Sequence, residues 1–60
     1  MSSRRAELGA AIRARRLLRG WRQLDLAAVL ATTRERIADL ERGRGWPTEE
    51  ECRALRVILP

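Results

Sequence analysis

Arginine is the residue type in this sequence with the most capacity for chemistry. All 13 positive charges are arginines, and the chain has no lysine, histidine, tyrosine or phenylalanine. A guanidinium presents several N–H donors in a fixed fork that matches the oxygens of phosphates and carboxylates. Histidine, the usual general base near neutral pH, is absent, and the only serines are Ser2 and Ser3 near the N-terminus. The residues therefore predict binding of a polyanion and argue against an enzyme.

The positive charge is concentrated in the first third of the chain. Residues 1–22 contain seven arginines and one glutamate, a net charge of +6, whereas residues 23–60 contain six arginines and seven acids, a net charge of −1. Nucleic acid is the first candidate partner for such a basic excess. A solvated helix face covered with arginines is the alternative.

The rest of the composition limits the classes of protein to which the chain can belong. Sixty residues, 45% of them hydrophobic and 35% charged, indicate one small domain with a limited core. The single cysteine, Cys52, cannot form an intramolecular disulfide or a metal cluster, and we expect a small buried hydrophobe there rather than a reactive thiol. The longest apolar run, Leu26 to Ala31, is far shorter than the about 20 residues that span a bilayer. Ala6 and Glu7 stand where a secretory leader would have its apolar segment. We expect a soluble, cytoplasmic protein with no cofactor, no metal and no membrane partner.

Glycine and proline divide the sequence into helix-sized pieces, and no segment alternates in the way of a strand. Four helices are predicted, at about residues 3–19, 23–30, 34–42 and 48–59, which makes the fold all-α and compact. Gly20 is placed to end the first helix in the left-handed conformation. Thr33 is placed to cap the third helix, and Thr48 with Glu51 has the spacing of a capping box at the fourth.

Apolar residues recur at helical spacing in each of these segments and define a candidate core. Leu17 lies 900° along the helix from Leu8 and should point to solvent, whereas Arg16 lies one turn beyond Ile12 at the edge of the apolar stripe. The positions expected to face inward are Leu8, Ala11, Ile12 and Leu18 in the first helix, Leu26, Ala27 and Leu30 in the second, Ile37, Leu40 and Glu41 in the third, and Cys52, Leu55 and Leu59 in the fourth.

The second and third predicted helices are short and are joined by only three residues, with a small residue, Ala27, where they cross. That arrangement is typical of a helix-turn-helix. From Leu8 to Leu59 the sequence resembles the Cro and phage-repressor (Xre-like) helix-turn-helix family. The positions that carry the resemblance are Ile12, Arg16, Gly20, Gln23, Leu26-Ala27, Thr33, Ile37, Leu40-Glu41-Arg42-Gly43 and Pro47. The resemblance implies a lambda-repressor-like fold that binds double-stranded DNA.

The resemblance also implies roles for single positions. The third helix would be the recognition helix, whose first residues enter the major groove. The residues implied are Thr33, Arg34, Glu35 and Asp39 for base contacts, Arg22 and Gln23 for phosphate contacts, and Arg16 with Glu41 for a partly buried ion pair.

The chemistry of the side chains agrees with such roles. Arg34 can donate a fork to guanine, and Glu35 or Asp39 can accept from the amino group of cytosine. Further phosphate anchors, which position a protein without reading sequence, are expected at Arg36, Arg42 and Arg44. A solvated surface charge is the alternative for each of these side chains.

Three positions depart from the family pattern, and one of them is Arg56, which stands where the family tends to have a small apolar residue. Arg22 stands where the family usually has a serine or threonine N-cap, an exchange that costs roughly 1 kcal/mol of capping. It also places a cation where a bound phosphate would be favourable. Ala31 occupies a turn position where the family prefers glycine, and alanine is strained there if the backbone is left-handed.

The leading hypothesis is a non-enzymatic transcriptional regulator that binds specific DNA sequences. Recognition of paired half-sites would require a homodimer, for which the apolar candidates are Leu17, Trp46, Val57 and Ile58. The alternative is a protein-interaction module or an antitoxin-like regulator that holds an acidic protein partner through the basic first helix. A steep fall of affinity for duplex DNA with salt would separate the two hypotheses.

Overall fold

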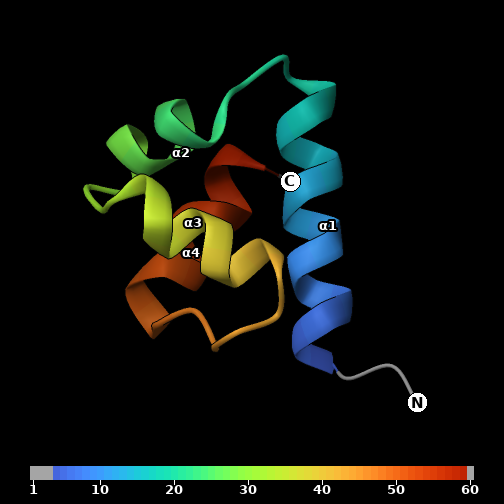
Figure 1. The fold of residues 1–60 in the computed structure, drawn as a ribbon. Coiled ribbons are helices and arrows are strands. Elements are labelled where there is room, and N and C mark those ends of the chain that lie inside the picture. Colours follow the sequence, from blue (N-terminus) through green and yellow to red (C-terminus); the bar gives the residue numbers. More distant parts are fainter. Residues whose placement is uncertain (1–3, 60) are drawn as a thin grey trace.

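The computed structural model describes residues 4–59 and places four helices and no strand in that range: α1 (Arg4–Leu18), α2 (Gln23–Val29), α3 (Arg34–Glu41) and α4 (Glu49–Ile58). The prediction of an all-α fold is therefore confirmed, with bounds within two residues of those expected. Ser2, Ser3 and the start of the first predicted helix lie outside the described residues. Figure 1 shows α1 along one side of the molecule and α2 to α4 beside it, with α4 behind α3. α3 packs against both α1 and α2.

The helix ends follow from the capping residues. Gly20 follows α1 with φ +72°, the left-handed conformation expected of it. The Thr33 hydroxyl accepts from the Arg36 amide at 3.2 Å and caps α3. At α4, Thr48 and Glu51 form the predicted capping box: the Thr48 hydroxyl accepts from the Glu51 amide at 3.1 Å, and the Glu51 carboxylate accepts from the Thr48 amide at 2.8 Å. These contacts satisfy backbone donors that a helix start leaves open.

The core lies where the four helices converge. Leu26 and Ile37 are fully buried, and the other buried members of the cluster are Ile12, Ala27, Leu55 and Leu59. Leu8, Trp21, Leu30 and Ile58 pack against this cluster while partly exposed. Cys52 is half-buried rather than part of the innermost core.

The structure contradicts the prediction that Leu18 belongs to the core. The pattern assigned it to the inward face of the first helix, and the structure leaves it 86% exposed. Two residues earlier, Arg16 occupies the inward direction in the last turn of α1 and is only 6% exposed. A separation of two residues rotates a side chain by about 200°, so Leu18 points away from the other helices. Trp21, beyond the turn, packs against the core in its place.

The crossing of α1 and α3 depends on a glycine that the sequence pattern did not single out. Gly9 is buried, and a Cβ at this position would overlap the carbonyl oxygens of Leu40 and Glu41 at the end of α3. Backbone atoms cannot swing aside as a flexible side chain can, so any larger residue would have to separate the two helices. Gly9 therefore fixes how closely the end of α3 approaches α1.

Candidate nucleic-acid interface

The turn between α2 and α3 brings the first residues of both helices together. Ala31 has φ +55°, so this non-glycine residue occupies the left-handed region. The Thr32 amide donates to the Ala27 carbonyl at 2.9 Å and closes the turn. As a result, the Arg34 guanidinium at the start of α3 donates to the Gln23 side-chain oxygen at the start of α2, at 2.9 Å.

A continuous chain of hydrogen bonds runs from that contact into the interior. Gln23 donates through Nε2 to Glu41 Oε1 at 3.1 Å. Glu41 in turn accepts a bidentate fork from Arg16, with Nε to Oε2 at 2.6 Å and Nη2 to Oε1 at 3.0 Å. The remaining terminal nitrogen of Arg16 donates to the Trp21 carbonyl at 2.7 Å. The exposed Arg34 is thereby connected to the packing of α1 against the end of α3.

The ion pair within this chain is withdrawn from water. The Arg16 side chain is 7% exposed and the Glu41 side chain 3%. Such a pair is tolerated in an interior only when its donors and acceptors are satisfied. Among residues 4–59, no buried side-chain nitrogen or oxygen lacks a hydrogen-bond partner. The pair therefore joins α1 to the end of α3, and removal of either partner alone would leave the charge of the other uncompensated.

The N-cap of α2 is Arg22, and a carboxylate three residues later takes the place of the usual hydroxyl cap. The Arg22 side chain holds no acceptor, but the Asp25 carboxylate reaches back to the Arg22 amide at 2.8 Å and also accepts from the guanidinium at 3.1 and 3.2 Å. These hydrogen bonds lower the pKa of Asp25 and keep it ionised. Both residues are solvent-accessible, so the contact contributes little stability while it orients the arginine. Sequence reasoning missed Asp25, although its spacing of three from the N-cap is that of a capping acid.

Arg36 has a different partner from the phosphate expected for it. Its guanidinium donates to Glu51 at 2.9 and 3.3 Å and to the Trp46 carbonyl at 2.9 Å. The hydrogen bond from Arg36 is the main cause that holds the pKa of Glu51 below its usual value. Glu51 thus serves the capping box of α4 and the joint between α3 and α4 at once. In the free protein the Arg36 guanidinium is therefore part of the contact between α3 and α4.

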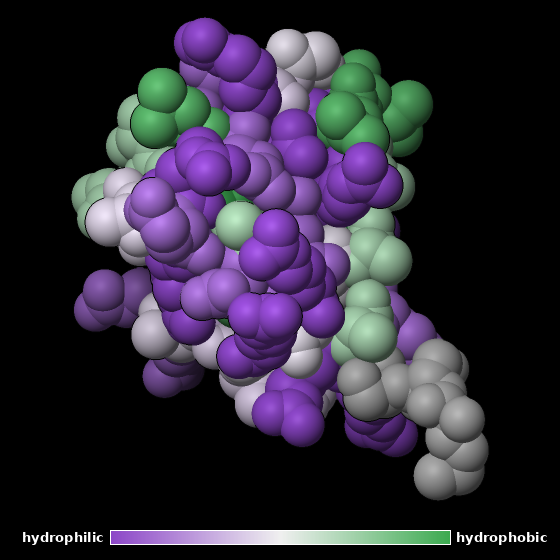
Figure 2. Space-filling model, in the orientation of Figure 1, coloured by the Kyte–Doolittle hydropathy of each residue, from purple (hydrophilic) through white to green (hydrophobic). Residues whose placement is uncertain are grey.

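The remaining expected site residues lie in α3 or within three residues of its ends. Glu35, Arg42 and Arg44 are exposed, Asp39 is half-buried, and Thr33 is exposed with its hydroxyl used as the cap. Figure 2, in the orientation that has α3 in front of α4, shows a largely hydrophilic surface over this part of the molecule. Arg34 and Gln23 are thus brought together, whereas the phosphate candidates Arg42 and Arg44 lie at the other end of α3.

Three of the four apolar residues that were expected at a homodimer interface are exposed. Leu17, Trp46 and Val57 are exposed, at 52%, 56% and 81%, whereas Ile58 packs against the core. Further large apolar side chains that the pattern did not assign to a surface are also exposed: Leu18, Leu24 and Val29.

The arrangement offers donors rather than reactive groups. Within residues 4–59, no three His, Cys, Asp or Glu side chains are grouped so as to hold a metal ion. None of the helices in that range has the length and apolar content needed to cross a membrane.

Comparison with known proteins identifies the family to which the chain belongs. A family model described as helix-turn-helix matches residues 12–59, which is well over half of the chain and includes α2, α3, α4 and the end of α1 from Ile12 onward. A search of curated proteins returned no match. The matched family binds DNA and is not an enzyme family. The chain belongs to the Cro/C1-type (Xre-like) helix-turn-helix family.

Proposed function

We propose that this DNA-binding protein is a transcriptional regulator that reads a specific double-stranded sequence by inserting the N-terminal part of α3 into the major groove. The hydrogen bond between Arg34 and Gln23 is the observation that carries the proposal. A long arginine on a helix surface ordinarily samples many rotamers, and ordering it costs free energy on binding. Here one guanidinium N–H is already occupied by a residue that Glu41 holds in turn. The other donors remain for a base edge.

The role proposed for each side chain in DNA binding follows from its position and from whether it donates or accepts hydrogen bonds. Arg34 would give its fork to O6 and N7 of a guanine, and Glu35 or Asp39 would accept from N4 of a cytosine. The second N–H of the Gln23 amide and the exposed cations would contact phosphates, which fix the register of α3 in the groove. The proposed contacts are Thr33, Arg34, Glu35 and Asp39 to bases, and Arg22, Gln23, Arg42 and Arg44 to phosphates.

Selection of preferred sites from a random duplex pool, followed by affinity measurements on the selected site, tests this assignment. Arg34→Ala should relax the preference at one base pair, with a loss of about 1–3 kcal/mol on the selected site and little on random DNA. Arg42→Ala should weaken all sequences alike and reduce the slope of log affinity against log salt by about one. Arg53→Ala is the matched control, because Arg53 is an exposed arginine of α4 whose ion pair within residues 4–59 is with Glu49 at 3.2 Å.

Equal losses from Arg34→Ala and Arg42→Ala on every sequence would refute the groove assignment. Binding that does not change between low and high salt would refute contact with phosphates altogether. A palindromic selected site would in addition establish a homodimer, and its half-site spacing would give the separation of the two α3 helices.

A further inference from the structure

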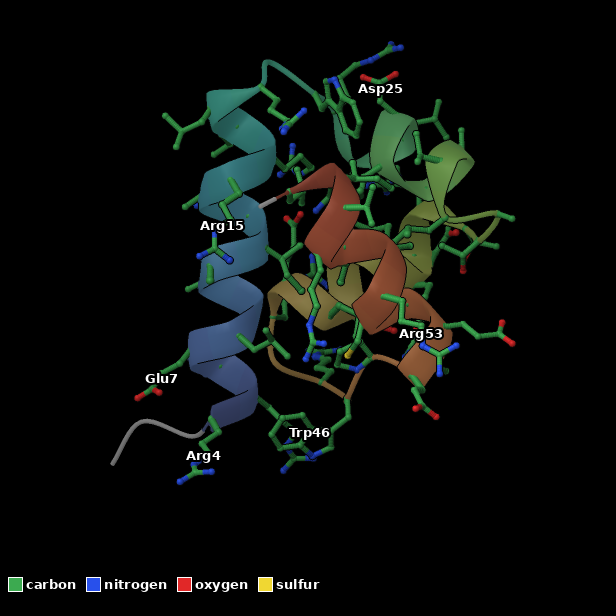
Figure 3. All side chains as sticks on the ribbon, turned by 180° about the vertical axis from the view of Figure 1, so that it is seen from behind. Arg4, Glu7, Arg15, Asp25, Trp46 and Arg53 are labelled. Atoms are coloured by element: carbon green, nitrogen blue, oxygen red, sulfur yellow. The ribbon has the colours of Figure 1, made fainter. Side chains whose placement is uncertain are left out.

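An apolar groove lies between α1 and α4. Its volume is about 240 Å³, and its lining residues are Leu8, Ile12, Arg15, Pro47, Cys52, Leu55, Arg56 and Leu59. α3 stands in front of α4 in Figure 1, whereas α4 stands in front in Figure 3, which shows α1 and α4 side by side with Arg15 on α1. The groove therefore opens on the face of the molecule opposite to the recognition helix.

The charged residues that line the groove are all positive. Of its lining residues only Arg15 and Arg56 are charged, and no acid is among them. Both are exposed, and within residues 4–59 neither takes part in an ion pair. The acids of α4 are confined to its first turn, where Glu49 and Glu51 already bind arginines. Two unpaired cations beside an apolar floor match a ligand that combines apolar side chains with carboxylates.

The size of the groove distinguishes between classes of ligand. Pockets for small molecules enclose about 300–1,000 Å³, so this groove is too small for most of them but accommodates a few aliphatic side chains. From Leu8 to Arg15 it follows α1 for seven residues, or about 10 Å at the rise of an α-helix. A helix of similar length presents apolar anchors at i, i+3 or i+4, and i+7 on one face.

We propose that the α1–α4 groove binds an acidic amphipathic helix of another protein, whose apolar side chains enter the groove and whose carboxylates pair with Arg15 and Arg56. A second copy of this chain is a poorer occupant, because it would bring the same basic α1 against these arginines. The groove and α3 face opposite sides, so such a partner would bind whether or not DNA is present. The inference is independent of the proposed function.

Peptide selection tests the groove directly, because it requires only the chemistry of the partner and not its identity. A library of random 14-residue peptides displayed on phage is selected against the full chain, and enriched peptides are synthesised with a fluorescent label. We expect peptides rich in Asp and Glu with apolar residues at helical spacing. Arg15→Glu/Arg56→Glu should weaken their binding by about tenfold or more, since it removes two attractions and adds repulsion. Arg53→Glu, which reverses an exposed charge of α4 outside the groove, should leave the affinity unchanged.

Three results would overturn the proposal: no enriched peptide, enriched peptides without acidic residues, or equal losses from the groove and control variants. Circular dichroism must show equal unfolding temperatures for the variants, which is expected because the replaced side chains are exposed. Sedimentation equilibrium of the free protein provides a further test of the proposal. A dimer that Arg15→Glu/Arg56→Glu dissociates would contradict it, because the groove would then bind a second copy of the chain. Retained binding of random duplex DNA by the double variant would separate failure of this proposal from failure of the DNA-binding function.

Discussion

Removal of the Glu41 carboxylate tests whether the buried joint between α1 and α3 determines stability. In Glu41→Ala, Arg16 keeps its hydrogen bond to the Trp21 carbonyl but loses both bonds to the carboxylate, at 2.6 and 3.0 Å. Gln23 loses an acceptor at 3.1 Å. The Arg16 side chain is only 7% exposed, so water has little access to the stranded guanidinium.

The expected cost is large for a chain of this size. Breaking a buried ion pair by removal of one partner costs about 3–5 kcal/mol. At about 0.05–0.15 kcal/mol per residue, a chain of 60 residues has a total stability of only about 3–9 kcal/mol. The unfolding temperature should therefore fall by about 12 °C or more, since each kcal/mol corresponds to about 4–8 °C in a small domain.

Urea and thermal unfolding followed by circular dichroism measure the effect, with Glu50→Ala as the control because Glu50 is exposed. Equal stability of the two variants would refute the reasoning. If Glu41→Ala is too unstable to fold, Arg16→Met/Glu41→Met provides the decisive comparison. Replacing both charges removes the stranded guanidinium, so the double variant should recover much of the lost stability. A double variant no more stable than Glu41→Ala would show that the packing at this joint, and not the unpaired charge, is responsible.

Three other substitutions have consequences that follow from local geometry. Gly9→Ala should destabilise the protein by about 1–3 kcal/mol in urea unfolding, because its Cβ would overlap carbonyl oxygens of α3, and an unchanged midpoint would contradict the close approach. Ala31→Gly should raise stability by up to about 1 kcal/mol, since a left-handed alanine costs about 1–2 kcal/mol and the added freedom of the unfolded glycine offsets part of the gain. The folded state lowers the pKa of Glu51 from its ordinary value of 4.5, so the contribution of this residue is fully present above that value and is lost as pH falls through the lower folded pKa. Glu51→Gln should accordingly flatten the loss of stability below about pH 4.5 in acid titrations, and a titration identical to that of the unchanged protein would argue against the Arg36 contact.

Local rules were sufficient for most of the fold. The capping residues Thr33 and Thr48 and the left-handed Gly20 act over one turn of helix, so the sequence alone predicted them. Leu18 was assigned wrongly because the apolar pattern does not show that the charged Arg16, about 200° away on the helix, takes the inward direction in the last turn of α1. Gly9 was missed because the closeness of two backbones depends on how helices distant in the sequence cross.

The candidate site was less predictable, because an arginine has several partners of similar chemistry. Periodicity places Arg36 and Arg42 on the surface of one helix, yet the former binds Glu51, whereas the latter stays exposed. The choice depends on α4, whose first turn brings Glu51 beside α3. Asp25 was similarly overlooked, because the expected cap was a hydroxyl at the N-cap rather than a carboxylate three residues later.

Each tryptophan lies beside one of two ion pairs between helices, the buried α1–α3 pair and the partly exposed α3–α4 pair. The chain has two tryptophans and no other aromatic residue, and their backbone carbonyls accept from the arginines of the two interhelical ion pairs: Trp21 from Arg16 and Trp46 from Arg36. Trp21 also lies beneath the Arg19 guanidinium, 6.0 Å from the ring centroid. Intrinsic fluorescence of Trp46→Phe would then follow the α1–α3 joint alone, and that of Trp21→Phe the α3–α4 joint. Unfolding measured in the two variants would tell whether the joints separate together or one after the other.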